Sequence, residues 1–186
     1  ILGCDKEYIW AGGNSSLTLM SQYLSYLCIQ GIGDGPWSSE ERVSILCPVP
    51  GYDRHFVLSE NLGLNMISVP LDGHGPNLDV IRSYVEEDDS IRGIWCVPKH
   101  SNPTGETYSK ETIEGLISIF GNTRKKSRIF WDNAYAVHDF DNVYGVGVTL
   151  LAPCFVLSVY FAFRELNHLT NAIISRNPIS KAKEYF

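Results

Sequence analysis

Four short segments rich in polar residues are candidates for chemistry, because each follows a stretch that is expected to form a β-strand. They are Gly12–Ser16, Pro50–His55, Ser101–Gly105 and Asp132–Tyr135. In open α/β sheets, ligand sites form at the carboxyl ends of the strands. The positions of the four segments therefore predict that they meet in one binding site.

The first segment has the composition of a phosphate-binding turn. Gly12 and Gly13 allow a tight turn, while Asn14 and Ser15 offer side-chain donors. The helix expected after them directs its N-terminal amides and the positive end of its dipole toward the same point. An ordinary glycine-rich turn, capped by Asn14 or Ser15, explains the same residues.

The third segment presents a carboxamide. Pro103 restricts Asn102 to extended backbone, which holds the amide in a fixed direction. A carboxamide can donate one hydrogen bond while it accepts another. A simple Pro-Thr-Gly turn is the alternative interpretation.

The fourth segment places a carboxylate directly after an apolar strand. Asp132 there needs a cationic or hydrogen-bonding partner to offset its loss of water. A protonated heterocyclic nitrogen would satisfy it and would be kept protonated by its charge. Tyr135 follows three residues later. A carboxylate that only caps a helix or a turn is the alternative.

Strands and helices alternate along the chain. We expect strands at Glu7–Ala11, Arg42–Cys47, Asn65–Val69, Ile91–Val97 and Ser127–Trp131, and helices at Ser16–Ile29, Tyr52–Glu60, Leu78–Glu87, from Ser109 onward and at Leu166–Ser175. Several strands are apolar throughout, which is typical of a parallel sheet covered on both faces. The pattern predicts an α/β fold, a three-layer sandwich with a mainly parallel sheet.

Apolar residues at helical spacing predict which helix faces are buried. They are Leu17, Met20, Tyr23, Leu24 and Leu27 in the first helix, Val80, Ile81 and Val85 in the third, and Ile113, Leu116, Ile117 and Phe120 in the helix after Ser109.

Composition narrows the class of protein. The 186 residues are 44% hydrophobic and 19% charged, which suits one globular domain. The net charge of −6 gives no support to a nucleic-acid surface. Five cysteines without a CxxC spacing favour reduced thiols in the cytoplasm over a disulfide framework or a metal site. No signal peptide or initiator Met is visible, so we expect the chain to start inside a longer protein.

The segment Gly145–Phe163 departs from this pattern, because it contains no charged residue over nineteen positions. Its length makes it a transmembrane candidate. Pro153, the glycines Gly145 and Gly147, and the lack of a flanking basic cluster argue against that. We expect a buried or interface segment, with a membrane anchor or a locally scrambled reading frame as alternatives.

Taken together, the four segments resemble the fold-type I pyridoxal-phosphate enzymes, in particular the class I and II aminotransferases and their bacterial aspartate-aminotransferase-like subgroup. The matching stretches are AGGNSSLTLM (11–20), CPVPGYDRHF (47–56), VPKHSNPTGETYS (97–109) and WDNAYAVHDF (131–140). The resemblance covers about residues 8–140, and weakly 165–186. Their order and spacing agree with the family.

The resemblance implies a role for each matching residue. Gly13, Asn14 and Ser15 correspond to the turn that binds the cofactor phosphate, and Asp132 to the aspartate that pairs with the pyridine nitrogen. Asn102 and Tyr135 correspond to residues that contact the phenolic oxygen, Asn102 also orienting the substrate carboxylate. The aromatic residue that stacks on the ring often stands where this chain has Val49. Tyr52 or His55 would then replace it, unless Tyr52 is only a packed loop residue.

The chain also departs from the family. A lysine that forms the Schiff base with the cofactor is expected beyond Phe186, since Lys181 and Lys183 precede the next expected strand and are interpreted as solvated residues. The small C-terminal domain with its carboxylate-binding arginine and the N-terminal arm are absent from 1–186. No catalytic residue is therefore assigned within the chain.

The sequence thus predicts part of the pyridoxal-phosphate-binding large domain of an aminotransferase. The intact parent would transfer an amino group between an amino acid, aspartate being one candidate, and a 2-oxo acid. It would act in the cytoplasm as a homodimer. The alternatives are a non-catalytic effector-binding module of the same shape, an inactive gene fragment, and a membrane-associated protein.

Overall fold

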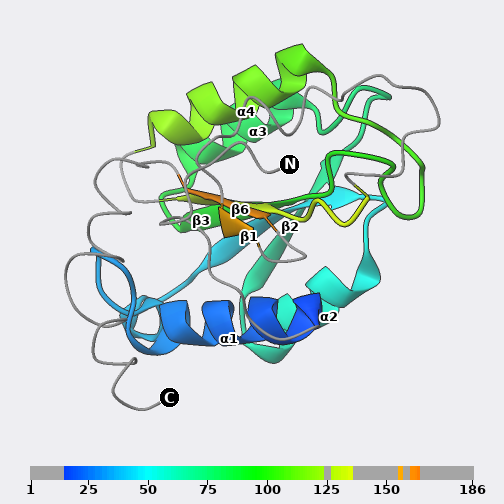
Figure 1. The fold of residues 1–186 in the computed structure, drawn as a ribbon. Coiled ribbons are helices and arrows are strands. Elements are labelled where there is room, and N and C mark those ends of the chain that lie inside the picture. Colours follow the sequence, from blue (N-terminus) through cyan, green and yellow to red (C-terminus); the bar gives the residue numbers. More distant parts are fainter. Residues whose placement is uncertain (1–14, 124–126, 136–154, 157–159, 164–186) are drawn as a thin grey trace.

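The computed structural model describes residues 15–123, 127–135, 155–156 and 160–163. Several predictions lie outside these residues: Gly13 and Asn14, the strand Glu7–Ala11, the helix Leu166–Ser175 and most of Gly145–Phe163. The described residues form a single sheet in the order β2-β1-β3-β4-β6-β5, with helices on both of its faces (Figure 1).

The first four strands are parallel, as the apolar runs predict. They are β1 (Ser44–Val49), β2 (Asn65–Pro70), β3 (Ile91–Cys96) and β4 (Arg128–Trp131). β3 and β4 are buried at every position, whereas most of the edge strand β2 is exposed or half-buried. Cover on both faces accounts for the burial of these central strands, and the arginine that each contains, Arg92 in β3 and Arg128 in β4, is buried against polar partners.

Two short antiparallel strands extend the sheet beyond β4. They are β6 (Tyr160–Phe163), which pairs with β4, and β5 (Phe155–Val156), which pairs with β6. Both lie in the uncharged segment 145–163, whose second half therefore includes strands. Within the described ranges, the structure contains no helix both long enough and apolar enough to cross a bilayer.

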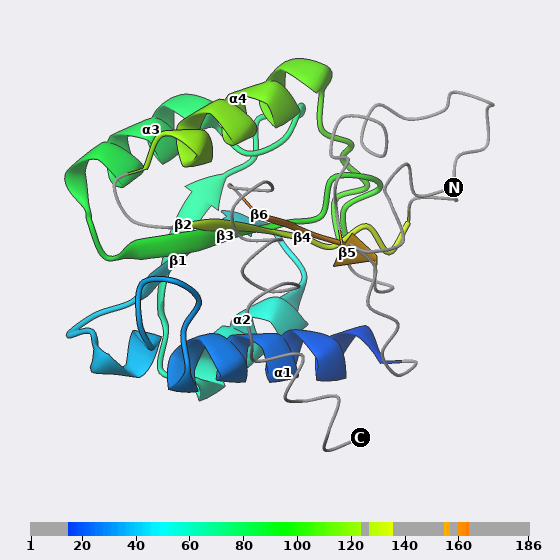
Figure 2. The ribbon, with the colours of Figure 1, turned by 60° about the vertical axis from the view of Figure 1, so that its left-hand side comes forward.

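The helices cover the two faces of the sheet in pairs. Figure 2 shows α1 (Ser16–Ile29) and α2 (Asp53–Asn61) on one face, and α3 (Leu78–Glu87) and α4 (Lys110–Gly121) on the other. A short 3-10 turn, η2 (Trp37–Ser39), follows α1. The three layers of the α/β sandwich are confirmed.

Side-chain caps begin three of these helices. The caps are Ser15 for α1, Asn77 for α3 and Ser109 for α4, and each accepts a hydrogen bond from the amide three residues later. Such caps satisfy amides that have no partner within the helix. The bounds of α1 and α3 agree with the sequence prediction for this reason.

Each face of the sheet has its own core. Met20, Leu24 and Leu27 of α1 pack with Trp95 and Phe130 on one side. Residues of α3 and α4 pack on the other side, including Ile81, Ile113, Leu116 and Phe120. Two details of the predicted faces were wrong. Ile117 is 40% exposed while Ile119 is buried, and Leu19 is buried although it was not assigned to the core face of α1.

Candidate functional site

The carboxyl ends of β1, β3 and β4 carry three of the four polar segments. These strands are parallel neighbours, so the segments that follow Val49, Cys96 and Trp131 leave the sheet at the same edge. The N-terminal end of α1, where Ser15 lies, points toward the same edge in both views (Figures 1 and 2). The fold therefore gathers segments that are far apart in sequence.

Asp132 is the buried acid of this edge. It is 6% exposed and directly follows β4. Its Oδ2 atom lies 3.0 Å from Nε2 of His55, and its Oδ1 atom accepts a hydrogen bond from the amide of Ala134 at 3.2 Å. The carboxylate thus has the partner that its burial requires, and one oxygen also makes the turn contact considered as its alternative role.

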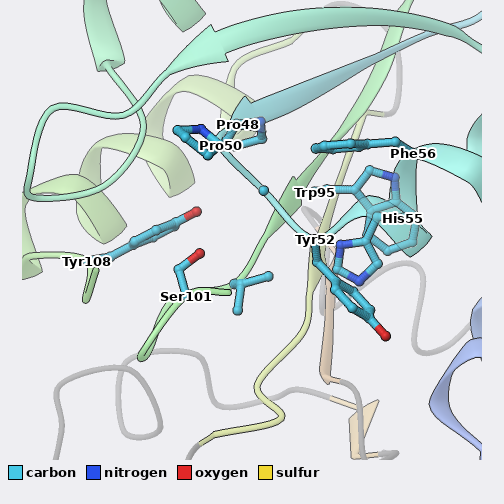
Figure 3. A pocket seen from close by; sticks show the side chains of 10 residues that line it. Pro48, Pro50, Tyr52, His55, Phe56, Trp95, Ser101 and Tyr108 are labelled. Atoms are coloured by element: carbon cyan, nitrogen blue, oxygen red, sulfur yellow. The ribbon is translucent and has the colours of Figure 1, made fainter. Parts of the chain in front are cut away.

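His55 is held between aromatic rings. It lies in the first turn of α2, 1% exposed, and its imidazole stacks on the indole of Trp95 with ring centroids 4.3 Å apart and an interplanar angle of 11°. The ring of Tyr52 meets it edge to face at 5.1 Å. Figure 3 shows this group of three rings beside the loop after β1. The imidazole thus lies between two aromatic rings while its Nε2 atom faces Asp132.

Tyr52 occupies the N-cap position of α2 rather than its first turn. It is half-buried, and its main aromatic contact is with His55. Tyr52, His55, Trp95, Ser101 and Tyr108 are among the residues that line a cavity of about 10 Å³ at this edge (Figure 3). That volume holds about one water molecule. The cavity is a small gap in the wall of the site and is too small for an organic cofactor.

Asn102 lies at the tip of the loop between β3 and α4. The loop is closed by two backbone hydrogen bonds, from the amide of Gly105 to the carbonyl of Ser101 and from the amide of Ser101 to the carbonyl of Glu106. Asn102 is exposed and makes no hydrogen bond to another described residue. The turn considered as an alternative is therefore present, and it leaves the carboxamide open to a ligand.

The remaining candidates lie at the ends of described segments. Ser15 is exposed, and its Oγ atom accepts from the amide of Thr18 at 3.3 Å. Tyr135 is half-buried and ends the described residues after β4. Between Asp132 and Tyr135 stands Asn133, 5% exposed, whose buried Oδ1 atom accepts no hydrogen bond in the part of the chain described. Such an acceptor is costly unless a ligand or another segment supplies a donor.

Sequence reasoning missed the partner of Asp132. His55 was considered only as a ring that could stack on a cofactor, whereas the structure pairs it with the carboxylate. One signal was present: a buried carboxylate needs a donor, and His55 is a side-chain donor in another segment expected at the same edge. The contact between Trp95 and His55 had no sequence signal, because an aromatic residue in a buried strand is expected to be part of the core.

Comparison with known proteins shows which family the chain resembles. The family model described as aspartate amino-transferase matches residues 1–154. A Mycolicibacterium smegmatis protein is 46% identical over 140 residues, and aminotransferase is its provisional name. An aspartate aminotransferase of Corynebacterium glutamicum is 44% identical over the same length. Each match covers 74% of this chain and 32% of the relative, so the chain spans about a third of the length of these relatives.

A solved structure shows the same fold. The crystal structure of an aspartate transaminase from Corynebacterium glutamicum superposes with a TM-score of 0.76 at 33% identity, over 99% of this chain and 47% of that one. An alanine aminotransferase from Pyrococcus furiosus shares the fold alone, with a TM-score of 0.62 at 18% identity. By the matched family model, the identity and the fold, the chain belongs to the aspartate aminotransferase family, within the fold-type I pyridoxal-phosphate enzymes.

Proposed function

We propose that residues 1–186 are part of the large domain of an aminotransferase and bind pyridoxal phosphate. The observation that supports this most strongly is Asp132, a buried carboxylate at the carboxyl end of a central parallel strand, held in place by His55. In open α/β folds this edge of the sheet is where ligands bind. The intact protein would transfer an amino group between an amino acid and a 2-oxo acid.

The residues present fit the cofactor. An ionised carboxylate has about four acceptor positions, and described residues occupy two of those on Asp132. A protonated pyridine nitrogen can take a further position. When bound, pyridoxal phosphate supplies an electron sink for the carbanion at the substrate α-carbon. Asp132 would keep the ring nitrogen protonated through its negative charge, and so would strengthen that sink.

The other candidates would hold the rest of the cofactor. Ser15, with Gly13 and Asn14 before it, would bind the phosphate together with the N-terminal amides of α1, whose fourteen residues supply a full helix dipole. Asn102 and Tyr135 would contact the phenolic oxygen, and Asn102 would also orient the substrate carboxylate. Tyr52 would lie against the face of the pyridine ring.

The remaining parts of the reaction belong to the intact protein. The Schiff-base lysine would lie beyond Phe186, so the chain as it stands should bind the cofactor without a covalent bond and should not transaminate. The name of the Corynebacterium glutamicum relative supports aspartate as the amino donor. Assembly as a homodimer in the cytoplasm is what the family resemblance implies.

An absorbance titration tests this proposal. The chain is titrated with pyridoxal phosphate and, separately, with pyridoxal, which lacks the phosphate. We expect the cofactor spectrum to change with saturation, and pyridoxal to bind more weakly because the amides at the start of α1 lose their anion. An unperturbed spectrum in a sample shown to be folded by circular dichroism would contradict the proposal.

A further inference from the structure

Trp95 interacts with His55 in two ways. Its side chain extends from β3 into the layer under α1 and α2, and it is 2% exposed. Its indole lies flat against the imidazole of His55, with 4.3 Å between ring centroids. Its Nε1 atom donates to Oγ of Ser59 at 3.0 Å, and that hydroxyl donates to the carbonyl oxygen of His55 at 2.9 Å. The indole therefore contacts both the ring and, through Ser59, the backbone of His55.

Trp95 also contacts the strand that carries Asp132. It is paired in register with Phe130 of β4, and the two rings pack at 4.7 Å with an interplanar angle of 35°. Because side chains alternate along a strand, Phe130 and Asp132 project from the same face of the sheet. Trp95 is thus a spacer between the helix that carries His55 and the strand end that carries Asp132.

The hydrogen bond of this indole distinguishes it from two other buried tryptophans. Trp37 and Trp131 are as deeply buried, yet their Nε1 atoms have no hydrogen-bond partner in the described part of the chain. A buried indole N–H gains from an acceptor wherever it lies, but the acceptor of Trp95 is Ser59, whose hydroxyl also bonds the backbone of His55. Core filling alone leaves this link and the parallel stacking of Trp95 on His55 unexplained.

We propose that Trp95 is a positioning residue for the cofactor site. Together with Ser59 it fixes the plane and the direction of the His55 imidazole, so that Nε2 meets Oδ2 of Asp132 and holds that carboxylate toward the ring nitrogen. Only the last step, from Asp132 to the cofactor, rests on the proposed function. The placement of His55 by Trp95 is a property of the chain alone.

The first measurement needs no cofactor. In the proton NMR spectrum of the chain, the ring protons of His55 should resonate upfield, because they lie over the face of the Trp95 indole. A His55→Gln variant assigns these signals. Trp95→Leu should move them toward the position of an exposed histidine, whereas Trp95→Phe, which keeps an aromatic face, should retain a large part of the shift.

The second measurement is the affinity for pyridoxal phosphate by absorbance. Trp95→Leu should weaken binding about tenfold, the lower end of what losing the support of a ligand side chain costs in metal sites. Trp95→Phe should recover part of this loss. Ser59→Ala, which removes the acceptor of the indole N–H, should weaken binding about threefold. Trp37→Leu is the matched control, a buried tryptophan without a contact to His55, and should change neither readout.

The outcomes separate the inference from the proposed function. If the parent chain binds the cofactor and the Trp95 and Ser59 variants bind it equally well, the inference is overturned and the function stands. If the parent chain does not bind while the His55 signals still depend on Trp95, the function fails and the placement of His55 stands. If Trp95→Leu does not fold, Trp95→Phe and Ser59→Ala decide, and wild-type affinity and His55 signals in both would overturn the inference.

Discussion

Nε2 of His55 lies 3.0 Å from Oδ2 of Asp132, although 77 residues separate the two positions in sequence. Both side chains are buried, at 1% and 6% exposure. The contact joins the first turn of α2 to the end of β4, and so joins two segments that carry candidate site residues. It is therefore a structural link between two segments of the candidate site.

Removing the imidazole should destabilise the fold. In His55→Phe, the carboxylate of Asp132 remains buried with only the amide of Ala134 as a described donor. Breaking one partner of a buried pair costs about 3 kcal/mol or more, so the free energy of unfolding should fall by that amount. Urea denaturation measures it. The double variant His55→Phe, Asp132→Leu should regain part of the loss, and a single-variant loss below about 1 kcal/mol would show that the pair does not matter.

A buried arginine ties the loop after α1 to the sheet. Arg128 of β4 is 1% exposed, and its Nη2 atom donates to the carbonyl of Ile32 at 3.1 Å and lies 3.7 Å from Oδ1 of Asp34. Arg128→Met should lower the free energy of unfolding by about 2 kcal/mol, because the carbonyl of the buried Ile32 loses its charged donor.

The control for that variant is an exposed pair of the same chemistry. Arg42, whose side chain is 59% exposed, contacts Asp88 at 3.0 Å. Arg42→Met should cost less than about 1 kcal/mol, as surface ion pairs do. Equal decreases of the free energy of unfolding in the two arginine variants would mean that burial of Arg128 adds nothing to the stability of the fold.

Stability should fall in alkaline solution. Burial raises the pKa of the Cys47 thiol from 9.0 to about 12, and it also raises the pKa values of Cys96, Tyr23 and Tyr108. Above pH 9 the unfolded chain releases the Cys47 proton while the folded chain keeps it. The contribution of Cys47 is therefore complete below pH 9 and is lost as pH rises toward 12, by about 1.4 kcal/mol per pH unit, whereas that of the tyrosines is lost only above their ordinary pKa of 10.0.

Urea denaturation from pH 8 to pH 10.5 checks this dependence. Cys47→Ala should reduce the loss of stability above pH 9 by the contribution of one buried thiol. The matched control is Cys28→Ala, which removes a thiol from a half-buried site and should reduce the loss less. Unfolding midpoints that do not change between pH 8 and pH 10.5 would contradict the assignment of these thiols and phenols as buried acids.

The helices that have both an N-cap residue and apolar residues at clear helical spacing were predictable from sequence. The bounds of α1 and α3 match because Ser15 and Asn77 mark their starts. The strand predicted at Arg42–Cys47 was displaced, since β1 runs from Ser44 to Val49 and includes Pro48. Pro48 is tolerated because it lies beyond the part of β1 that pairs with β3, where a missing N–H costs less. Neighbouring strands, which the local sequence does not reveal, decided the bounds.

The buried face of α4 was also decided by tertiary contacts that the local sequence does not reveal. Apolar periodicity favoured Ile117, yet the face is turned toward Thr112 and Ile119. Thr112, a polar residue, is buried because its hydroxyl donates to the carbonyl of His74 at 2.9 Å. A contact with the distant turn before α3 thus stabilises Thr112 on the buried face of the helix. Likewise Asp132 could be recognised at a strand end, and His55 lay in another segment expected at the same edge, but only the tertiary structure shows that the two side chains meet.

The observed buried face of α4 can be tested by two matched substitutions in that helix. Ile117→Ala removes an exposed side chain and should change the free energy of unfolding by about 0.5 kcal/mol or less. Ile113→Ala leaves a cavity in the core between α4 and the sheet and should cost about 2 kcal/mol or more. Urea denaturation gives both values, and a larger loss for Ile117→Ala would restore the face predicted from sequence.

The most direct test of the cofactor site replaces one atom of Asp132. Asp132→Asn keeps the shape of the side chain but removes the charge that would pair with the pyridine nitrogen, and Asp79→Asn on the exposed surface of α3 is the matched control. In an absorbance titration with pyridoxal phosphate, we predict that Asp132→Asn binds about tenfold more weakly or worse, while Asp79→Asn binds like the parent chain. Equal affinity of all three folded proteins would contradict the account.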